Sequence, residues 1–150
     1  MIRDRKAQSQ FISYDGICYN KEFKDDSRGT YRPMDIDAVL CFTKKSHKEM
    51  HYTNAVLLYE FKYKDAKLSI GEEITYCSIA DCVSDSGGLG VVAVVSHDVD
   101  APEDVDGAEG IVTKFYYAKH RKWYTPGQKI TAKQFTDVFL MRAGLKKTSR

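Results

Sequence analysis

The sequence lacks the features that mark several large classes of protein. It contains no apolar stretch that approaches the ~20 residues needed to span a bilayer, so we expect no transmembrane helix. Residues 1–6 are largely charged and no apolar segment follows them, so we expect no signal peptide. Internal repeats and low-complexity segments are also missing. These absences favour a soluble globular protein, and we expect it in the cytoplasm.

Cysteines are few, and their spacing does not suggest a metal site. The four cysteines lie at positions 18, 41, 77 and 82, and without a secretory context we expect reduced thiols. Cys77 and Cys82 are too far apart for a zinc knuckle, and the acidic segment 98–109 does not have EF-hand spacing. The sequence therefore predicts neither a zinc site nor an EF-hand.

Basic residues outnumber acidic residues only slightly. Lys and Arg total 23 and Asp and Glu total 21, which gives a net charge of +2. Any affinity for nucleic acid must therefore come from local basic patches and not from a global field. Charged residues make up 29% and hydrophobic residues 43% of the 150 residues, which is typical of one globular domain with a proper core. We expect that single domain to cover residues 1–150.

Apolar runs predict four main strands. The runs are rich in Val, Ile, Leu and Phe, and they cover residues 35–42, 55–63, 89–96 and 111–118. The run 55–63 is hydrophobic on both faces, so we expect it to be a central strand that is covered on both sides. A polar, basic segment between the first two runs predicts a long hairpin tip.

Two capping boxes predict two helices. Ser69 is followed three residues later by Glu72, and the glycines at 87–88 end the helical pattern. Thr131 and Gln134 form the second capping box, and a later glycine ends that helix. The order of strands and helices predicts an α/β or α+β domain, with helices that cover a central sheet.

Charged residues stand on two of the predicted strands. Asp37 lies near the start of the first strand, whereas Glu60 and Lys62 end the second. Side chains two residues apart on a strand point to the same face. Because an unpaired buried charge is very costly, these groups need partners. Together they predict either a metal-dependent catalytic site or a buried network of salt bridges.

The register of the predicted hairpin decides which charges meet. If Phe42 pairs with Ala55, then Asp37 lies opposite Glu60, with Cβ atoms ~5 Å apart. Two carboxylates at that distance repel each other and raise each other's pKa. A divalent cation removes the conflict, and Mg²⁺ prefers one or two carboxylates together with water and substrate phosphate.

The same register leaves a simpler alternative open. It places Asp35 opposite Lys62, where the two side chains can form an ordinary salt bridge at a solvated strand end. In that case the charges need no cation.

The arrangement resembles the PD-(D/E)xK nuclease superfamily, which has the restriction-endonuclease-like fold. In that family an Asp begins one strand, an acidic-x-Lys motif ends the next, and a helix follows. Here Asp37, Glu60 and Lys62 match these positions, and Pro33 stands a little farther before the Asp than usual. The resemblance covers roughly residues 27–96. It implies a central mixed sheet flanked by helices.

The resemblance also implies a function and roles for single residues. Asp37, Glu60 and the main-chain carbonyl of Phe61 would hold Mg²⁺ or Mn²⁺, while Lys62 would orient or activate the attacking water and stabilise developing charge. The protein would then be a nuclease that hydrolyses phosphodiester bonds in DNA. A catalytically silent relative that binds nucleic acid or a protein partner is the alternative. A homodimer would suit cleavage of both strands of a duplex.

Further acids belong to this expectation. Members of the family often carry another acidic residue on a first helix, and the candidates here are Asp15 and Glu22. Glu72 or Glu73, on the helix after the second strand, would line the cleft.

Two basic segments are candidate contacts for nucleic acid. One is the hairpin tip, and the other is the turn before Trp123, where cations stand beside aromatic residues as in backbone contact with base stacking. The alternatives are a solvated tip and a charged turn beside core aromatics. The candidate residues are Lys44, Lys45, Lys48, Arg121 and Lys122.

Overall fold

The computed structural model describes residues 19–22, 28–31 and 35–146. The chain divides into two compact units, Met1–Asp35 and Ile36–Arg150. In the first unit, the described residues form an antiparallel pair of strands, β1 (Tyr19–Glu22) and β2 (Arg28–Tyr31). Whether the whole chain is a single domain stays a prediction.

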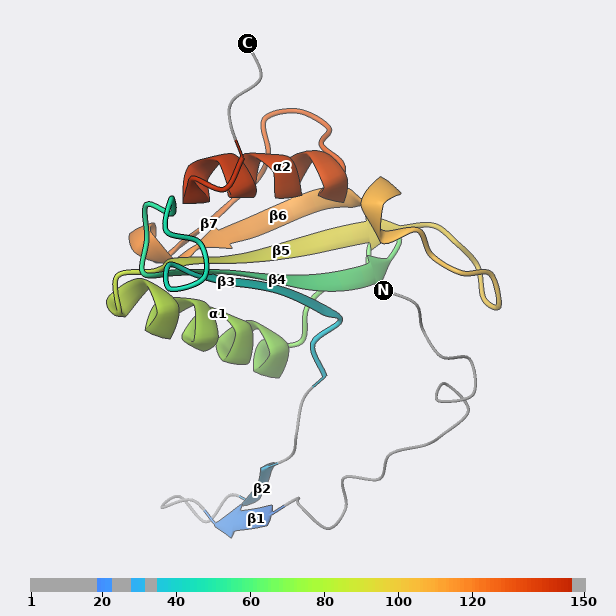
Figure 1. Ribbon diagram of the computed structural model, residues 1–150. Helices are drawn as coiled ribbons and strands as arrows, with labels where there is room; N and C mark the ends of the chain where they lie inside the picture. Colours follow the sequence, from blue (N-terminus) through green and yellow to red (C-terminus); the bar gives the residue numbers. More distant parts are fainter. Residues whose placement is uncertain (1–18, 23–27, 32–34, 147–150) are drawn as a thin grey trace, which may run out of the picture. The chain divides into compact units, whose positions relative to one another are not determined.

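The second unit is built on a five-stranded mixed sheet (Figure 1). The strands follow one another across the sheet in the order β3-β4-β5-β6-β7. β4 and β5 are parallel, whereas the other neighbouring pairs are antiparallel. The bounds are β3 (Ala38–Thr43), β4 (Asn54–Tyr63), β5 (Leu89–His97), β6 (Ile111–Tyr117) and β7 (Lys122–Tyr124). A mixed α/β architecture is confirmed, and the first predicted strand begins at Ala38 and not at Asp35.

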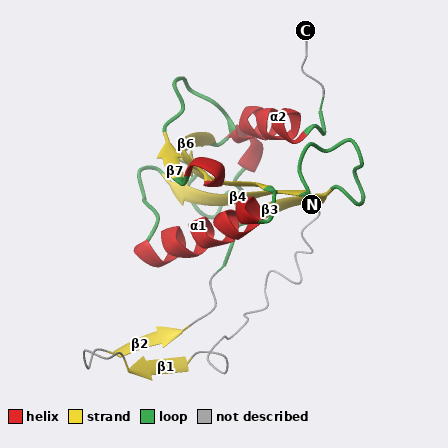
Figure 2. Cartoon of the chain, turned by 90° about the vertical axis from the view of Figure 1, so that its left-hand side faces the viewer, coloured by secondary structure: helices red, strands yellow, loops and turns green. Residues whose placement is uncertain are grey.

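Two helices cover opposite faces of the sheet (Figures 1 and 2). Helix α1 (Ile70–Asp85) joins the parallel strands β4 and β5, and α2 (Ala132–Ala143) ends the described chain on the other face. Both predicted capping boxes are present. Two short 3₁₀ helices complete the unit, η3 (Gly107–Glu109) and η4 (Ala118–His120).

The β3–β4 hairpin has the register that we assumed from the sequence. Phe42 pairs with Ala55, and the described ladder ends with Ala38 opposite Tyr59. Asp37 therefore lies one residue before the last pair, at the end of the hairpin that is far from its tip. Residues at even positions of β4, such as Leu58, pack in the cluster that faces α1. By the two-residue period of a strand, Glu60 belongs to the same face.

Close packing holds α1 against the sheet. Leu58 and Val92 of the sheet pack with Tyr76 and Ala80 of the helix, and all four are buried. Burial of each large apolar side chain contributes about 1.5–3 kcal/mol. A Cβ atom built on Gly90 would lie 2.2 Å from the main-chain oxygen of Ala80, so only glycine permits this approach. The packing fixes which residues of α1 face the end of β4.

The described part of the chain contains no helix that is long and apolar enough to cross a membrane. Cys41, Cys77 and Cys82 are free thiols, and Cys18 lies outside the described residues.

Candidate functional site

Two charged side chains end β4 on the face that α1 covers. Only 8% of Glu60 is exposed, and 18% of the Lys62 side chain is exposed. The Nζ atom of Lys62 lies 3.3 Å from Oε1 of Glu60. As predicted, an acid and a lysine two residues apart share one face of a strand.

Asp37 approaches this pair from the start of β3. Its Oδ2 atom accepts a hydrogen bond of 2.7 Å from the main-chain N–H of Phe61, between Glu60 and Lys62 in the chain. Its charge also contributes to raising the pKa of Glu60. The structure therefore brings together the charged trio of Asp37, Glu60 and Lys62.

The first turns of α1 hold two members of the trio. The carboxylate of Glu72 accepts a hydrogen bond of 2.8 Å from Nζ of Lys62, and the Tyr76 hydroxyl donates one of 2.9 Å to Oε2 of Glu60. Residues four apart on a helix share a face, which explains why both reach the end of β4. Glu72 was among the predicted residues. Sequence reasoning missed Tyr76, although its spacing from Glu72 is the signal that could have found it.

The capping box orients Glu72. The N–H of Ser69 donates to Oε1 of Glu72 at 3.4 Å, and Oε2 of the same carboxylate faces Lys62. Glu72 therefore caps the start of α1 with one carboxylate oxygen and binds Lys62 with the other.

Burial and neighbouring charges change the pKa values in the site. Burial raises the pKa of Glu60, and the charge of Asp37 raises it further. The hydrogen bond from Tyr76 and the charge of Lys62 lower it, but the net shift is upward. Burial alone would lower the pKa of Lys62, but the carboxylates of Glu72 and Glu60 raise it above its ordinary value. Lys62 is therefore a cation at neutral pH, and it is suited to stabilise negative charge and not to accept a proton.

Two carboxylates of the trio, those of Asp37 and Glu60, are the candidate ligands for a hard cation. Within the described ranges, no group of three or more His, Cys, Asp or Glu residues is arranged to hold a metal ion. Asp37 and Glu60 still supply two carboxylates, and Mg²⁺ is commonly bound by one or two carboxylates with water and phosphate completing its shell. A metal contact of the Phe61 carbonyl stays a prediction.

The other predicted acids are not placed at the trio. Asp15 lies outside the described residues, and Glu22 ends β1 in the first unit, so their roles stay predictions. Asp35 also belongs to the first unit, and its alternative pairing with Lys62 stays open. Glu73 is near Cys77, and its charge follows burial among the causes that raise the pKa of that thiol to about 11.

The lysines of the hairpin tip lie far from the trio. Lys44, Lys45 and Lys48 are exposed in the loop between β3 and β4, at the opposite end of these strands. From Asn54 to Glu60 a strand that rises ~3.3 Å per residue covers about 20 Å. These exposed lysines can contact phosphates of a nucleic acid. They lie too far away to contact a phosphate bound at the trio.

The second basic segment is engaged with other side chains. Arg121 forms ion pairs with Asp81 at 2.6 Å and Asp85 at 2.5 Å, both on the last turns of α1. Nζ of Lys122 lies 5.2 Å from the ring centre of Tyr124. Contact of either residue with nucleic acid stays a prediction, and Arg121 would have to share its guanidinium with two acids.

Comparison of the chain with protein-family models, curated proteins and solved structures found no significant match.

Proposed function

We propose that the chain is a metal-dependent nuclease of the PD-(D/E)xK type, which hydrolyses phosphodiester bonds in DNA. The observation that carries the proposal is the meeting of Asp37, Glu60 and Lys62 at one end of the β3–β4 hairpin. An acid just before one strand and an acid and a lysine on the next are the groups that such chemistry needs.

The order of elements supports a restriction-endonuclease-like fold. An antiparallel hairpin carries the trio, α1 crosses over, and β5 returns parallel to β4. This is the order of strand, strand, helix and strand that the resemblance implies. The trio lies at the carboxyl end of β4, beside the start of the crossover helix, where parallel α/β units commonly bind ligands.

The residues of the site have distinct roles in this proposal. Bound Mg²⁺ or Mn²⁺ would make a coordinated water easier to ionise and offset charge on the phosphate. Asp37 and Glu60 would hold the cation through carboxylate oxygens. Lys62, kept as an ammonium by Glu72, orients the water and stabilises the charge that develops on the phosphate. Tyr76 holds the carboxylate of Glu60 in place.

A cleavage assay tests this proposal. Supercoiled and linear DNA are incubated with the full chain and Mg²⁺ or Mn²⁺, with a chelator as the blank. We expect cleavage that disappears in Asp37→Asn and Lys62→Ala. Asp65→Asn and Lys67→Ala make the same changes at exposed positions just beyond β4 and should cleave as the parent does. Absence of cleavage, or equal cleavage by all variants, contradicts the proposal.

The second candidate is a catalytically silent module that binds nucleic acid or a protein partner on the same fold. It is favoured by the contacts of Lys62, whose amine already meets two carboxylates, Glu60 and Glu72. A network that is neutralised in this way can be purely structural. This candidate predicts no metal binding at the trio.

Two further expectations belong to the proposal. A homodimer would place two sites on the two strands of a duplex, and light scattering on the purified chain measures its mass. A cytoplasmic location agrees with the three free thiols that the structure describes.

A further inference from the structure

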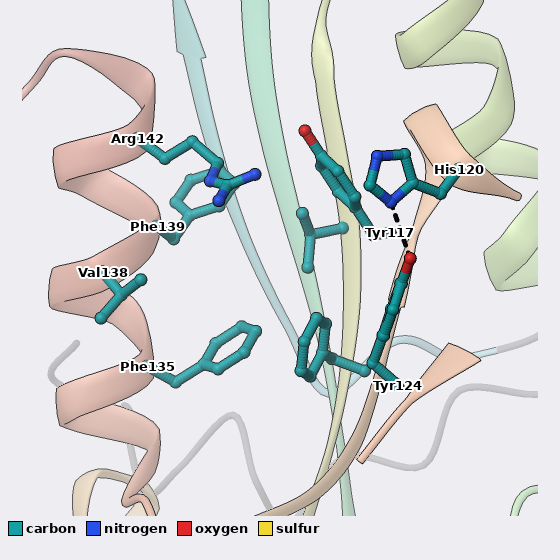
Figure 3. A pocket seen from close by; sticks show the side chains of 9 residues that line it. Tyr117, His120, Tyr124, Phe135, Val138, Phe139 and Arg142 are labelled. Atoms are coloured by element: carbon teal, nitrogen blue, oxygen red, sulfur yellow. Dashed lines mark hydrogen bonds between the residues drawn. The ribbon is translucent and has the colours of Figure 1, made fainter. Parts of the chain in front are cut away.

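A cavity of about 300 Å³ lies between α2 and the strands β5, β6 and β7 (Figure 3). Its lining residues pack on the face of the sheet that α2 covers, so it is separate from the charged trio. Aromatic rings form most of its wall: Phe115, Tyr117, Tyr124, Phe135 and Phe139. The volume is at the lower end of the range for small-molecule sites, which suits a ligand of one or two rings.

The rings are arranged to receive another flat ring. The ring centroids of Phe115 and Phe135 lie 5.2 Å apart with planes inclined by 56°, and Phe115 stacks on Tyr124 at 5.6 Å with planes inclined by 21°. Aromatic pairs at such distances gain energy beyond the area they bury. A planar apolar ring in the cavity would extend this stack.

One cation at the cavity, Arg142, has no carboxylate partner among the residues that the structure describes. The guanidinium of Arg142 lies 5.2 Å from the ring centre of Tyr117, and among the described residues no acid forms an ion pair with it. The nearby acid on α2, Asp137, is held instead by Lys133 and Lys146, each at 2.8 Å. Figure 3 shows the Arg142 side chain directed from α2 towards the strands. Its planar fork of donors matches a carboxylate.

Two other polar groups of the lining residues are paired with each other. Nδ1 of His120 and the hydroxyl of Tyr124 form a hydrogen bond of 2.7 Å. A nucleobase that lay with its polar edge against Phe115, Phe135 and Phe139 would lose hydrogen bonds to water, which is unfavourable. An apolar ring has no such edge.

We propose that this cavity binds a small, planar aromatic carboxylate, with its ring among the five aromatic side chains and its carboxylate on Arg142. The proposal does not depend on nuclease activity, because it uses the opposite face of the sheet. Nothing in it requires the charged trio to be active.

Calorimetry with naphthoate as the probe tests the proposal. We expect naphthoate to bind the full chain, and neutral naphthamide and adenosine monophosphate to bind at least about ten-fold more weakly. Arg142→Gln should weaken naphthoate binding by about ten-fold or more. Lys133→Gln removes a charge from an exposed position of the same helix and should leave the affinity unchanged.

A second variant tests whether naphthoate binds in this cavity, and it does so without changing a charge. The side chain of Val138 lines the cavity, and 48% of the residue is exposed, so Val138→Trp can fill the opening without disturbing buried core. We expect this variant to lose naphthoate binding while its thermal unfolding stays cooperative. The proposal is overturned if naphthoate gives no heat at millimolar concentration, if Arg142→Gln binds as well as the parent, or if the nucleotide binds better than naphthoate.

Discussion

The Tyr76 hydroxyl donates a hydrogen bond to the carboxylate of Glu60, and this contact joins α1 to the end of β4. Both residues are buried, with 1% of Tyr76 and 8% of Glu60 exposed. Burial raises the pKa of Tyr76 well above its usual range, and the adjacent Glu60 raises it further. The phenol therefore stays a donor at every physiological pH, and it supplies part of the solvation that Glu60 loses.

Replacing Tyr76 by phenylalanine should destabilise the fold while Glu60 is ionised. The change removes one hydrogen bond to a buried charged group, which costs about 1–3 kcal/mol. The loss should become smaller at acidic pH, where Glu60 is protonated. Urea unfolding at neutral and acidic pH measures both effects.

Tyr63→Phe is the matched control. Its hydroxyl donates to Asp100, but this pair is exposed, so the change should stay within about 0.5 kcal/mol. If Tyr76→Phe and Tyr63→Phe unfold at the same urea concentration, the contact with Glu60 does not stabilise the protein.

Replacing Lys62, the cationic side chain of the site, should lower the free energy of unfolding more than replacing Glu72. Lys62→Met leaves Glu60 and Glu72 without their shared partner. Breaking a fully buried pair costs about 3–5 kcal/mol, but the side chains of Lys62 and Glu72 keep 18% and 20% exposure, so we expect about 2 kcal/mol at neutral pH. Glu72→Gln keeps the pair of Lys62 with Glu60 and should cost less.

A double-mutant cycle checks this coupling. If Glu72 and Lys62 interact as the distance indicates, the double variant Lys62→Met with Glu72→Gln is more stable than the sum of the two single effects predicts. Strict additivity would show that their contact contributes nothing measurable.

Glu60 should make the metal-free protein less stable as the pH rises. Its folded-state pKa is raised, so its contribution to stability is fully present below the ordinary value of 4.5 and is lost as the pH rises through the folded-state pKa. Glu72 acts in the opposite direction, because burial alone would raise its pKa but Lys62 and Ser69 lower it. Its contribution is present above 4.5 and is lost as the pH falls through its folded-state pKa.

The variant Glu60→Gln separates these two effects. Its neutral amide can still accept from Tyr76, so its stability relative to the parent should increase from pH 4 to pH 8. Unfolding free energies measured across this range without metal give the difference. A difference that does not change with pH would show that the carboxyl of Glu60 has an ordinary pKa.

The hairpin tip gives a prediction about nucleic acid. Replacing Lys44, Lys45 and Lys48 by glutamine should weaken DNA binding and reduce the slope of log affinity against log salt by about 2–3, if each lysine meets one phosphate. Metal binding should not change, because the tip and the trio lie at opposite ends of the hairpin. Fluorescence anisotropy with labelled DNA at several salt concentrations measures the slope, and an unchanged slope would exclude these contacts.

Local sequence signals predicted much of the fold. The pairing of Phe42 with Ala55 was assumed from the sequence, and the hairpin has this register. Capping boxes are local signals, and Ser69 and Thr131 begin helices as predicted. The mixed sheet with helices on both faces follows from these elements.

Contacts between distant elements were beyond local signals. The spacing of Tyr76 from Glu72 indicates that the two residues share a face of α1, but the bond of Tyr76 with Glu60 also depends on how α1 lies against β4. The pairing of Arg121 with Asp81 also joins segments 40 residues apart, so a basic turn that suggested phosphate contacts is tied to the end of α1. The cavity beside α2 depends on the packing of β5, β6 and β7 against that helix.

The most direct test of the central claim is a calorimetric titration of the full chain with Mn²⁺ at neutral pH. The account predicts one site whose heat is lost in Asp37→Asn and in Glu60→Gln and is kept in Asp65→Asn. A chain that gives no site-specific heat, or whose Asp37→Asn variant binds Mn²⁺ as the parent does, would contradict it.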